Sequence, residues 1–110
     1  MSTHDILHRL SETLASRRHA DPETSYTAKM FAGGPDSILK KIGEETAELI
    51  MAGKEGNRLH IVRESADVVY HLLVLLTLYG MGIEDVSQEM RRREGISGID
   101  EKNSRGAKKQ

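Results

Sequence analysis

The chain has 110 residues, a formal net charge of −1 at pH 7 and no cysteine. This length suits a single domain, and the lack of cysteine excludes disulfides and thiolate metal sites. The charge is unevenly spread, because residues 91–110 carry +4 and the rest of the chain −5. A near-neutral total, with one Phe and no Trp, argues against nucleic-acid binding. An acidic body with a basic end instead fits a metal site in the body and phosphate contacts from the end.

The sequence predicts neither export nor membrane insertion. The N-terminus lacks a basic region followed by an apolar run. The longest apolar stretch, residues 68–79, is interrupted by His71 and Thr77 and falls short of the roughly 20 residues that a bilayer requires. We therefore expect a cytoplasmic protein with no membrane partner.

The spacing of apolar residues, together with the positions of Pro and Gly, predicts helices along most of the chain. No segment alternates at period two, so we predict an all-α fold of four to five helices in residues 1–95. From Gly95 onward we expect an extended, mobile tail, with residues 96–110 forming a basic C-terminal segment. The helices are predicted from about Thr3 to before Asp21-Pro22, and over 24–32, 35–52, 58–79 and 83–93.

The predicted helix over 58–79 is apolar on almost every side. Its one stripe that begins with polar residues becomes apolar further along, at Val74 and Leu78. A helix of this kind is normally buried all round. The few other helices of such a short chain can hardly surround it, so we expect a homodimer or a higher homo-oligomer.

Two pairs of acids at i,i+3 spacing carry the chemical signal: Glu45 with Glu48, and Glu64 with Asp67. Each pair lies on one face of its predicted helix, and Glu45 borders the apolar sector. The first pair alone would usually be surface charge. The second interrupts the most apolar helix, and buried acids need a counter-charge. Carboxylate oxygens suit Mg²⁺, with Mn²⁺ as an alternative, so we predict a metal site linked to phosphate chemistry.

Two further residues leave alternatives open. His71 is either a hydrogen-bonded core residue or a support for Asp67 one turn away. Lys41 either pairs with Glu44 or Glu45 as ordinary surface charge or neutralises a substrate phosphate.

The pattern Glu-x-x-Glu, fifteen residues, Glu-x-x-Asp resembles the signature of the MazG-like all-α NTP pyrophosphatase superfamily. Longer segments resemble, more specifically, the phosphoribosyl-ATP pyrophosphohydrolase family. These segments are residues 25–27, 41–48, 64–76 and 97–105.

The resemblance implies Mg²⁺-dependent hydrolysis of phosphoribosyl-ATP to phosphoribosyl-AMP and pyrophosphate, the second step of L-histidine biosynthesis. It also implies an α-helical dimer or larger oligomer. By this likeness the metal ligands are Glu45, Glu48, Glu64 and Asp67, with Glu44 beside them. Chemically, Glu44 or Glu45 could hold the attacking water as a general base, and Lys41, Lys102 and Arg105 could bind the phosphates.

Two rival functions remain. A house-cleaning nucleoside triphosphate pyrophosphatase would share the acids without needing segments 25–27 and 97–105. A non-catalytic helical dimerisation module would use the acids only to bind a structural cation. Release of pyrophosphate from phosphoribosyl-ATP, compared with ordinary nucleoside triphosphates, separates the three.

Overall fold

The computed structural model describes residues 3–108, and over that range it contains six α-helices and no strand. The prediction of an all-α fold is confirmed. The helices predicted over 24–32, 35–52, 58–79 and 83–93 agree with the structure to within about three residues at each end. The first helix ends earlier than predicted, at Arg17. The helices are α1 (Thr3–Arg17), α2 (Tyr26–Ala32), α3 (Gly34–Glu55), α4 (Arg58–Leu78), α5 (Ile83–Arg92) and α6 (Gly98–Lys108).

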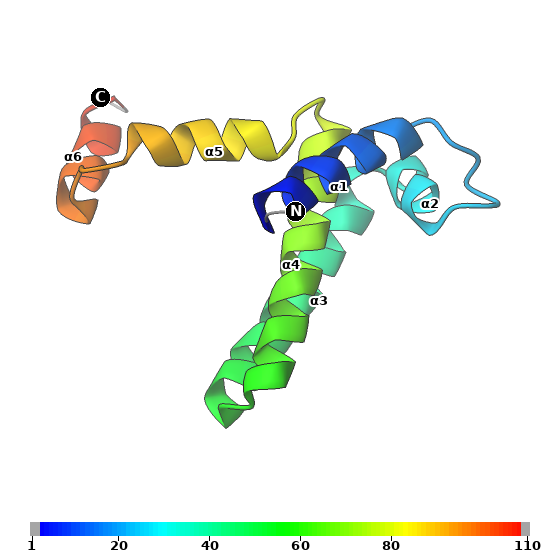
Figure 1. Ribbon diagram of the computed structural model, residues 1–110, viewed down its shortest axis with the longest axis horizontal. Helices are drawn as coiled ribbons and strands as arrows, with labels where there is room; N and C mark the ends of the chain where they lie inside the picture. Colours follow the sequence, from blue (N-terminus) through cyan, green and yellow to red (C-terminus); the bar gives the residue numbers. More distant parts are fainter. Residues whose placement is uncertain (1–2, 109–110) are drawn as a thin grey trace.

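The helices α3 and α4 form a long antiparallel hairpin, and α1 and α2 pack across one end of it (Figure 1). At that same end α5 leaves α4 at an angle of 101°, and α6 lies at the far end of α5. The core therefore sits where α1, α2 and the upper hairpin meet. Its buried residues include Leu14, Phe31, Ile38, Leu73 and Val74.

The helix ends follow from local chemistry. Gly56 adopts φ +74°, a left-handed conformation that terminates α3, so this helix runs three residues beyond its predicted end at 52. Asn57 then caps α4, because its Oδ1 accepts a hydrogen bond of 3.1 Å from the backbone N–H of His60. The resulting tight turn holds α3 and α4 side by side along their whole length.

The prediction of an extended tail from Gly95 onward is wrong, because residues 98–108 form α6. Ser97 Oγ accepts a hydrogen bond of 3.1 Å from the N–H of Asp100, and acids occupy the first turn. Those capping signals outweigh the helix-breaking glycines of the segment. Residues 109 and 110, the end of the predicted basic tail, lie outside the described residues.

The expectation that α4 is buried on all sides is wrong for the single chain. Val62 is 64 % exposed and Leu72 is 42 % exposed, on the side of α4 that no other helix covers. The radius of gyration is 16.3 Å, whereas a compact chain of this length has about 13 Å. The molecule is therefore open, and many of its large apolar side chains are exposed.

No single helix among residues 3–108 has both the length and the apolar character needed to cross a bilayer. The helices α4 and α5 meet that test only when taken together, and they are sharply bent relative to each other.

Candidate metal centre

Three carboxylates from two helices converge on one point of the hairpin. Oxygen atoms of Glu45 and Glu48, from α3, and of Glu64, from α4, all lie within 4.8 Å of one another. The antiparallel packing of α3 and α4 causes this convergence, since it places the acidic face of one helix against that of the other. The carboxylates are graded in burial: Glu64 is buried, Glu45 is half-buried, as predicted, and Glu48 is exposed.

Burial is the largest cause that raises the pKa of Glu64 above its ordinary value of 4.5. A hydrogen bond with Glu48 raises this pKa further, and so do the negative charges of Glu48, Asp67 and Glu45. The Oε2 atom of Glu64 is buried, with no hydrogen-bond partner among the described residues. A buried carboxylate oxygen facing other acids is satisfied by a divalent cation, and the all-oxygen donor set fits a hard cation such as Mg²⁺.

Asp67 lies one turn further along α4 and is exposed. Its charge contributes to the raised pKa of Glu64, but its carboxylate is not among the oxygens that converge within 4.8 Å. The structure thus brings three of the four predicted ligands together and leaves the fourth at the edge of the group.

His71 supports the backbone near Asp67 rather than its carboxylate. The Nδ1–H of His71 donates a hydrogen bond of 2.8 Å to the backbone carbonyl of Asp67, and the imidazole is buried. The Nε2 atom has no partner among the described residues. Of the two interpretations offered by the sequence, this geometry matches a hydrogen-bonded core histidine.

One neighbour of the centre was missed at the sequence level. The Nε2 atom of His60 lies 3.3 Å from Oε1 of Glu64. The two residues are four apart on α4, a spacing that places side chains on one face of a helix and could have identified the contact. His60 is exposed, so the contact links the buried carboxylate to the surface of α4.

Lys41 lies on α3, one turn before the acids, with its Nζ atom 3.9 Å from Oε2 of Glu44. Both side chains are partly exposed. The pairing agrees with the surface-charge interpretation, and the exposed ammonium stays accessible to a phosphate.

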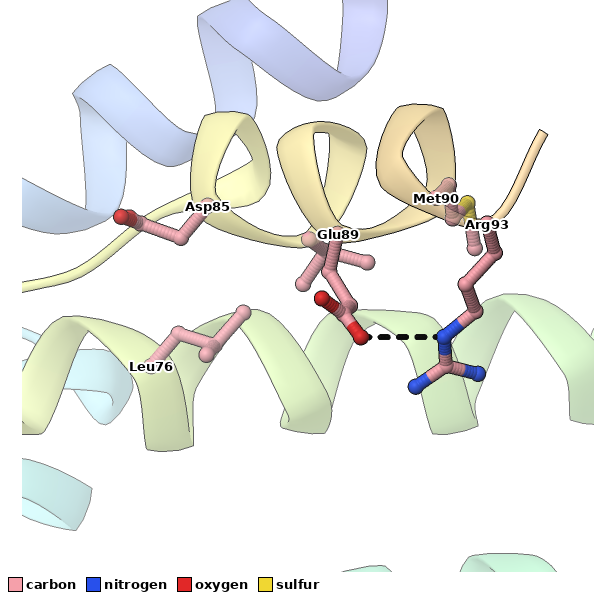
Figure 2. A pocket seen from close by; sticks show the side chains of 6 residues that line it. Leu76, Asp85, Glu89, Met90 and Arg93 are labelled. Carbon is pink, nitrogen blue, oxygen red and sulfur yellow. Dashed lines mark hydrogen bonds and ion pairs between the residues drawn. The ribbon is translucent and has the colours of Figure 1, made fainter. Parts of the chain in front are cut away.

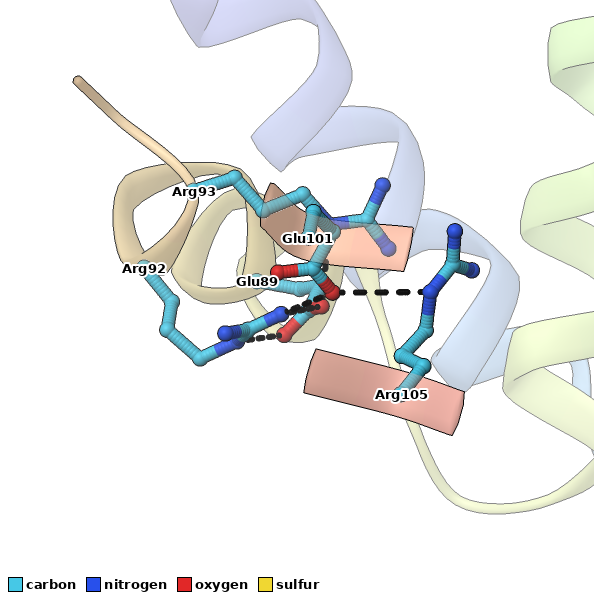
Figure 3. A network of polar contacts seen from close by, with 5 residues as sticks. All are labelled: Glu89, Arg92, Arg93, Glu101 and Arg105. Carbon is cyan, nitrogen blue, oxygen red and sulfur yellow. Dashed lines mark hydrogen bonds and ion pairs between the residues drawn. The ribbon is translucent and has the colours of Figure 1, made fainter. Parts of the chain in front are cut away.

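Lys102 and Arg105 do not join the carboxylates in this chain. They lie on α6, at the far end of α5 from the hairpin (Figure 1). Arg105 Nε is 3.6 Å from Oε1 of the buried Glu101, which also accepts a hydrogen bond from Arg92 (Figure 3). Arg92 in turn binds both oxygens of Glu89, at 2.8 and 2.9 Å. The network fastens α6 to α5.

A hollow of about 300 Å³ lies in the corner between α4 and α5, away from the carboxylates. Leu76 of α4 lines it together with Val86 and Met90 of α5. Glu89 and Arg93, which also line it, form an ion pair (Figure 2). Its mostly apolar walls suit a protein surface better than a phosphate.

The segment Ser25–Thr27 is tied to α4. Ser25 caps α2 through its side chain, which accepts from the N–H of Ala28. The hydroxyls of Thr27 and Tyr70 share a hydrogen bond of 2.6 Å. This bond fixes the start of α2 against the middle of α4, three residues beyond Asp67.

Comparison with known proteins gives a consistent result. Residues 7–94 match the model of the family described as phosphoribosyl-ATP pyrophosphohydrolase. A protein of Dechloromonas aromatica named phosphoribosyl-ATP pyrophosphatase is 82 % identical over 108 residues, which cover 98 % of this chain and all of that protein. Proteins of the same name from Aromatoleum aromaticum and Nitrosospira multiformis are 54 % and 53 % identical, over 92 % and 97 % of this chain and 94 % and 88 % of theirs. The chain belongs to the phosphoribosyl-ATP pyrophosphohydrolase family.

Proposed function

We propose that this chain is a phosphoribosyl-ATP diphosphatase of the cytoplasm that catalyses the second step of L-histidine biosynthesis. Water and phosphoribosyl-ATP give phosphoribosyl-AMP and pyrophosphate, so the bond between the α- and β-phosphates breaks. The observation that carries the proposal, within the family, is the convergence of Glu45, Glu48 and Glu64 around a buried oxygen without a partner.

In this proposal Glu45, Glu48 and Glu64 hold Mg²⁺, or alternatively Mn²⁺, and Asp67 approaches from the next turn. A bound divalent cation neutralises phosphate oxygens and helps to position the triphosphate. The three convergent oxygens supply the negative charge that such a cation needs.

The remaining chemistry falls to side chains of α3. Glu44, or whichever oxygen of Glu45 is free of the cation, holds the attacking water and accepts its proton. The exposed ammonium of Lys41 binds the phosphates. This binding breaks the 3.9 Å contact between Lys41 and Glu44, and so frees the carboxylate of Glu44. Lys102 and Arg105 complete the set of cations that bind this strongly anionic substrate.

We also propose that the working form is a homodimer or a higher homo-oligomer. The exposed apolar residues of α4 support this, because such surfaces on a small protein normally lie in an interface. A second hairpin packed against the first would complete a bundle around α4.

The test measures pyrophosphate release from phosphoribosyl-ATP and from a panel of ordinary nucleoside triphosphates. We expect a strong preference for phosphoribosyl-ATP, and loss of turnover on adding a chelator or on substituting Glu64→Gln. The matched control is Glu23→Gln, an exposed acid between α1 and α2, which should keep full activity. Equal turnover of ordinary triphosphates would indicate a house-cleaning enzyme, and no turnover of any substrate would indicate a cation-binding dimerisation module.

A further inference from the structure

We propose that His60 is a positioning residue of the candidate metal centre, and that it holds the buried carboxylate of Glu64 in the orientation that binds the cation. The imidazole does so through its Nε2 atom, from outside the group of ligands. This inference rests on the proposed function, and it adds to that function a residue that helps to set the affinity for Mg²⁺.

The side chain of His60 lies against the most deeply buried carboxylate of the centre. Its Nε2 atom is 3.3 Å from Oε1 of Glu64. The other oxygen of that carboxylate, Oε2, is buried and has no hydrogen-bond partner among the described residues. The two oxygens therefore have different surroundings, because Oε1 is next to an imidazole and Oε2 is left for a cation.

The imidazole lies outside the group of convergent ligand atoms. Oxygens of Glu45, Glu48 and Glu64 lie within 4.8 Å of one another, and no nitrogen of His60 belongs to that group. A hard cation such as Mg²⁺ also prefers oxygen ligands to nitrogen. A nitrogen that contacts a ligand without reaching the ion orients that ligand, which is the usual role of the outer partners of a metal site.

The turn between α3 and α4 fixes the backbone from which the imidazole projects. Oδ1 of Asn57 accepts the hydrogen bond of 3.1 Å from the backbone N–H of His60, the third residue of α4. Since Glu64 follows four residues later, the two side chains lie on the same face of the helix. Across the turn, Nδ1 of His60 is 4.0 Å from Oε2 of Glu55, the last residue of α3. The ring therefore lies between one carboxylate of each helix.

The helix itself gains little from a histidine at this position. The start of a helix favours acids over cations, because its unpaired backbone N–H groups give it a partial positive charge. Glutamate and glutamine suit the third position best. The cap does not require the imidazole either, since Asn57 binds the backbone of His60 and not its side chain. The contact with Glu64 is what gives the imidazole a role there.

A contact on Oε1 prepares the carboxylate for the ion. The neutral imidazole can carry its proton on Nε2, and the protonated ring always does, so an N–H is offered to Oε1 in either state. This N–H restricts the rotamers of Glu64 before the cation arrives. Metal binding then costs less conformational entropy, which raises the affinity of the site.

The test compares two substitutions of His60 with opposite expectations. His60→Gln keeps an N–H donor near the place of Nε2, whereas His60→Leu has a similar size and no donor. Isothermal titration calorimetry with Mg²⁺ alone, without substrate, measures the Kd. Loss of an outer partner weakens metal binding about 10- to 100-fold, and this imidazole is 46 % exposed, so we expect the lower end of that range. The Kd should rise about tenfold in His60→Leu and stay close to the wild-type value in His60→Gln.

The matched control is His19→Leu, which removes an exposed imidazole between α1 and α2 and should leave the Kd unchanged. The circular dichroism and Tm of all three variants should match those of the wild type, because the cap on the backbone of His60 remains. An unchanged Kd in His60→Leu would refute the proposal. An equal rise in His60→Gln, or a wild type that binds no Mg²⁺, would refute it as well.

Pyrophosphate release gives a second readout, which separates positioning from a general loss of structure. Half-maximal turnover of phosphoribosyl-ATP by His60→Leu should require about tenfold more Mg²⁺, while kcat at saturating Mg²⁺ stays near that of the wild type. A low kcat with an unchanged requirement for Mg²⁺ would contradict positioning. If His60→Leu binds Mg²⁺ more weakly than the wild type but neither protein hydrolyses phosphoribosyl-ATP, the proposed function fails and this inference stands.

Discussion

Truncation of Leu72 to Ala should weaken association of the chain without disturbing its carboxylates. Leu72 is 42 % exposed in the single chain. Full burial of a leucine side chain contributes about 1.5–3 kcal/mol, so covering its exposed part contributes about 0.6–1.3 kcal/mol in each copy. A two-fold interface repeats every contact, so the dimer should lose about 1–2.5 kcal/mol, which raises its Kd about fivefold to sixtyfold.

Sedimentation equilibrium over a range of concentrations measures this Kd directly. The matched control is Ile6→Ala, which removes an equally apolar side chain that is 54 % exposed on α1, outside the exposed apolar side of α4. Its Kd should match that of the wild type. An unchanged Kd for Leu72→Ala, or an equal increase for Ile6→Ala, would show that this side of α4 is not the interface. A wild type that stays monomeric at all concentrations would refute the assembly itself.

Three other outcomes are expected. Mg²⁺ at about one hundred times its Kd should raise the Tm of the wild type by on the order of 10 °C, as followed by calorimetry. The Tm of Glu64→Gln should stay nearly unchanged, and equal shifts of the two Tm values would place the cation elsewhere. The hydrogen bond from Arg92 lowers the pKa of Glu101 below 4.5. The stabilisation of α6 by this carboxylate is therefore present above about pH 4.5 and is lost as the pH falls further. The NMR chemical shifts of α6 should change below that pH in the wild type, and should already differ at pH 7 in Glu101→Gln. Thr27→Val breaks the bond to Tyr70 and should cost about 1 kcal/mol, or about 4–8 °C in Tm, whereas Thr24→Val on the exposed loop should cost much less.

The helical framework could be predicted because its signals are local. Apolar spacing, Pro35 at the start of α3 and Gly80 after α4 depend only on near neighbours in the chain. The helix α6 was missed because glycines at 95 and 98 dominate that segment. What stabilises it is partly local, the cap from Ser97, and partly remote, the contact between Arg92 and Glu101, which periodicity cannot reveal.

The carboxylate site was predictable for a different reason. Acids at i,i+3 on a helix must share a face, and burial of Glu64 followed from its apolar surroundings. Which acids meet depends on the register of α3 against α4, and the sequence does not encode that register in any one segment. The packing brings Glu64 to Glu45 and Glu48 and leaves Asp67 one turn away, and it adds His60, which the pattern of acids alone did not indicate.

The open shape of the chain and the burial of Glu64 are linked. A domain of this size has little core, and Glu64 occupies part of its longest packed interface with a group whose burial is unfavourable. A bound cation would offset the charge, but it would not replace the missing apolar contacts. A second copy placed on Val62, Val69 and Leu72 would add those contacts. The hairpin that carries the carboxylates would then depend on that interface for stability, so variants that weaken association should lose activity upon dilution before they lose their helical structure.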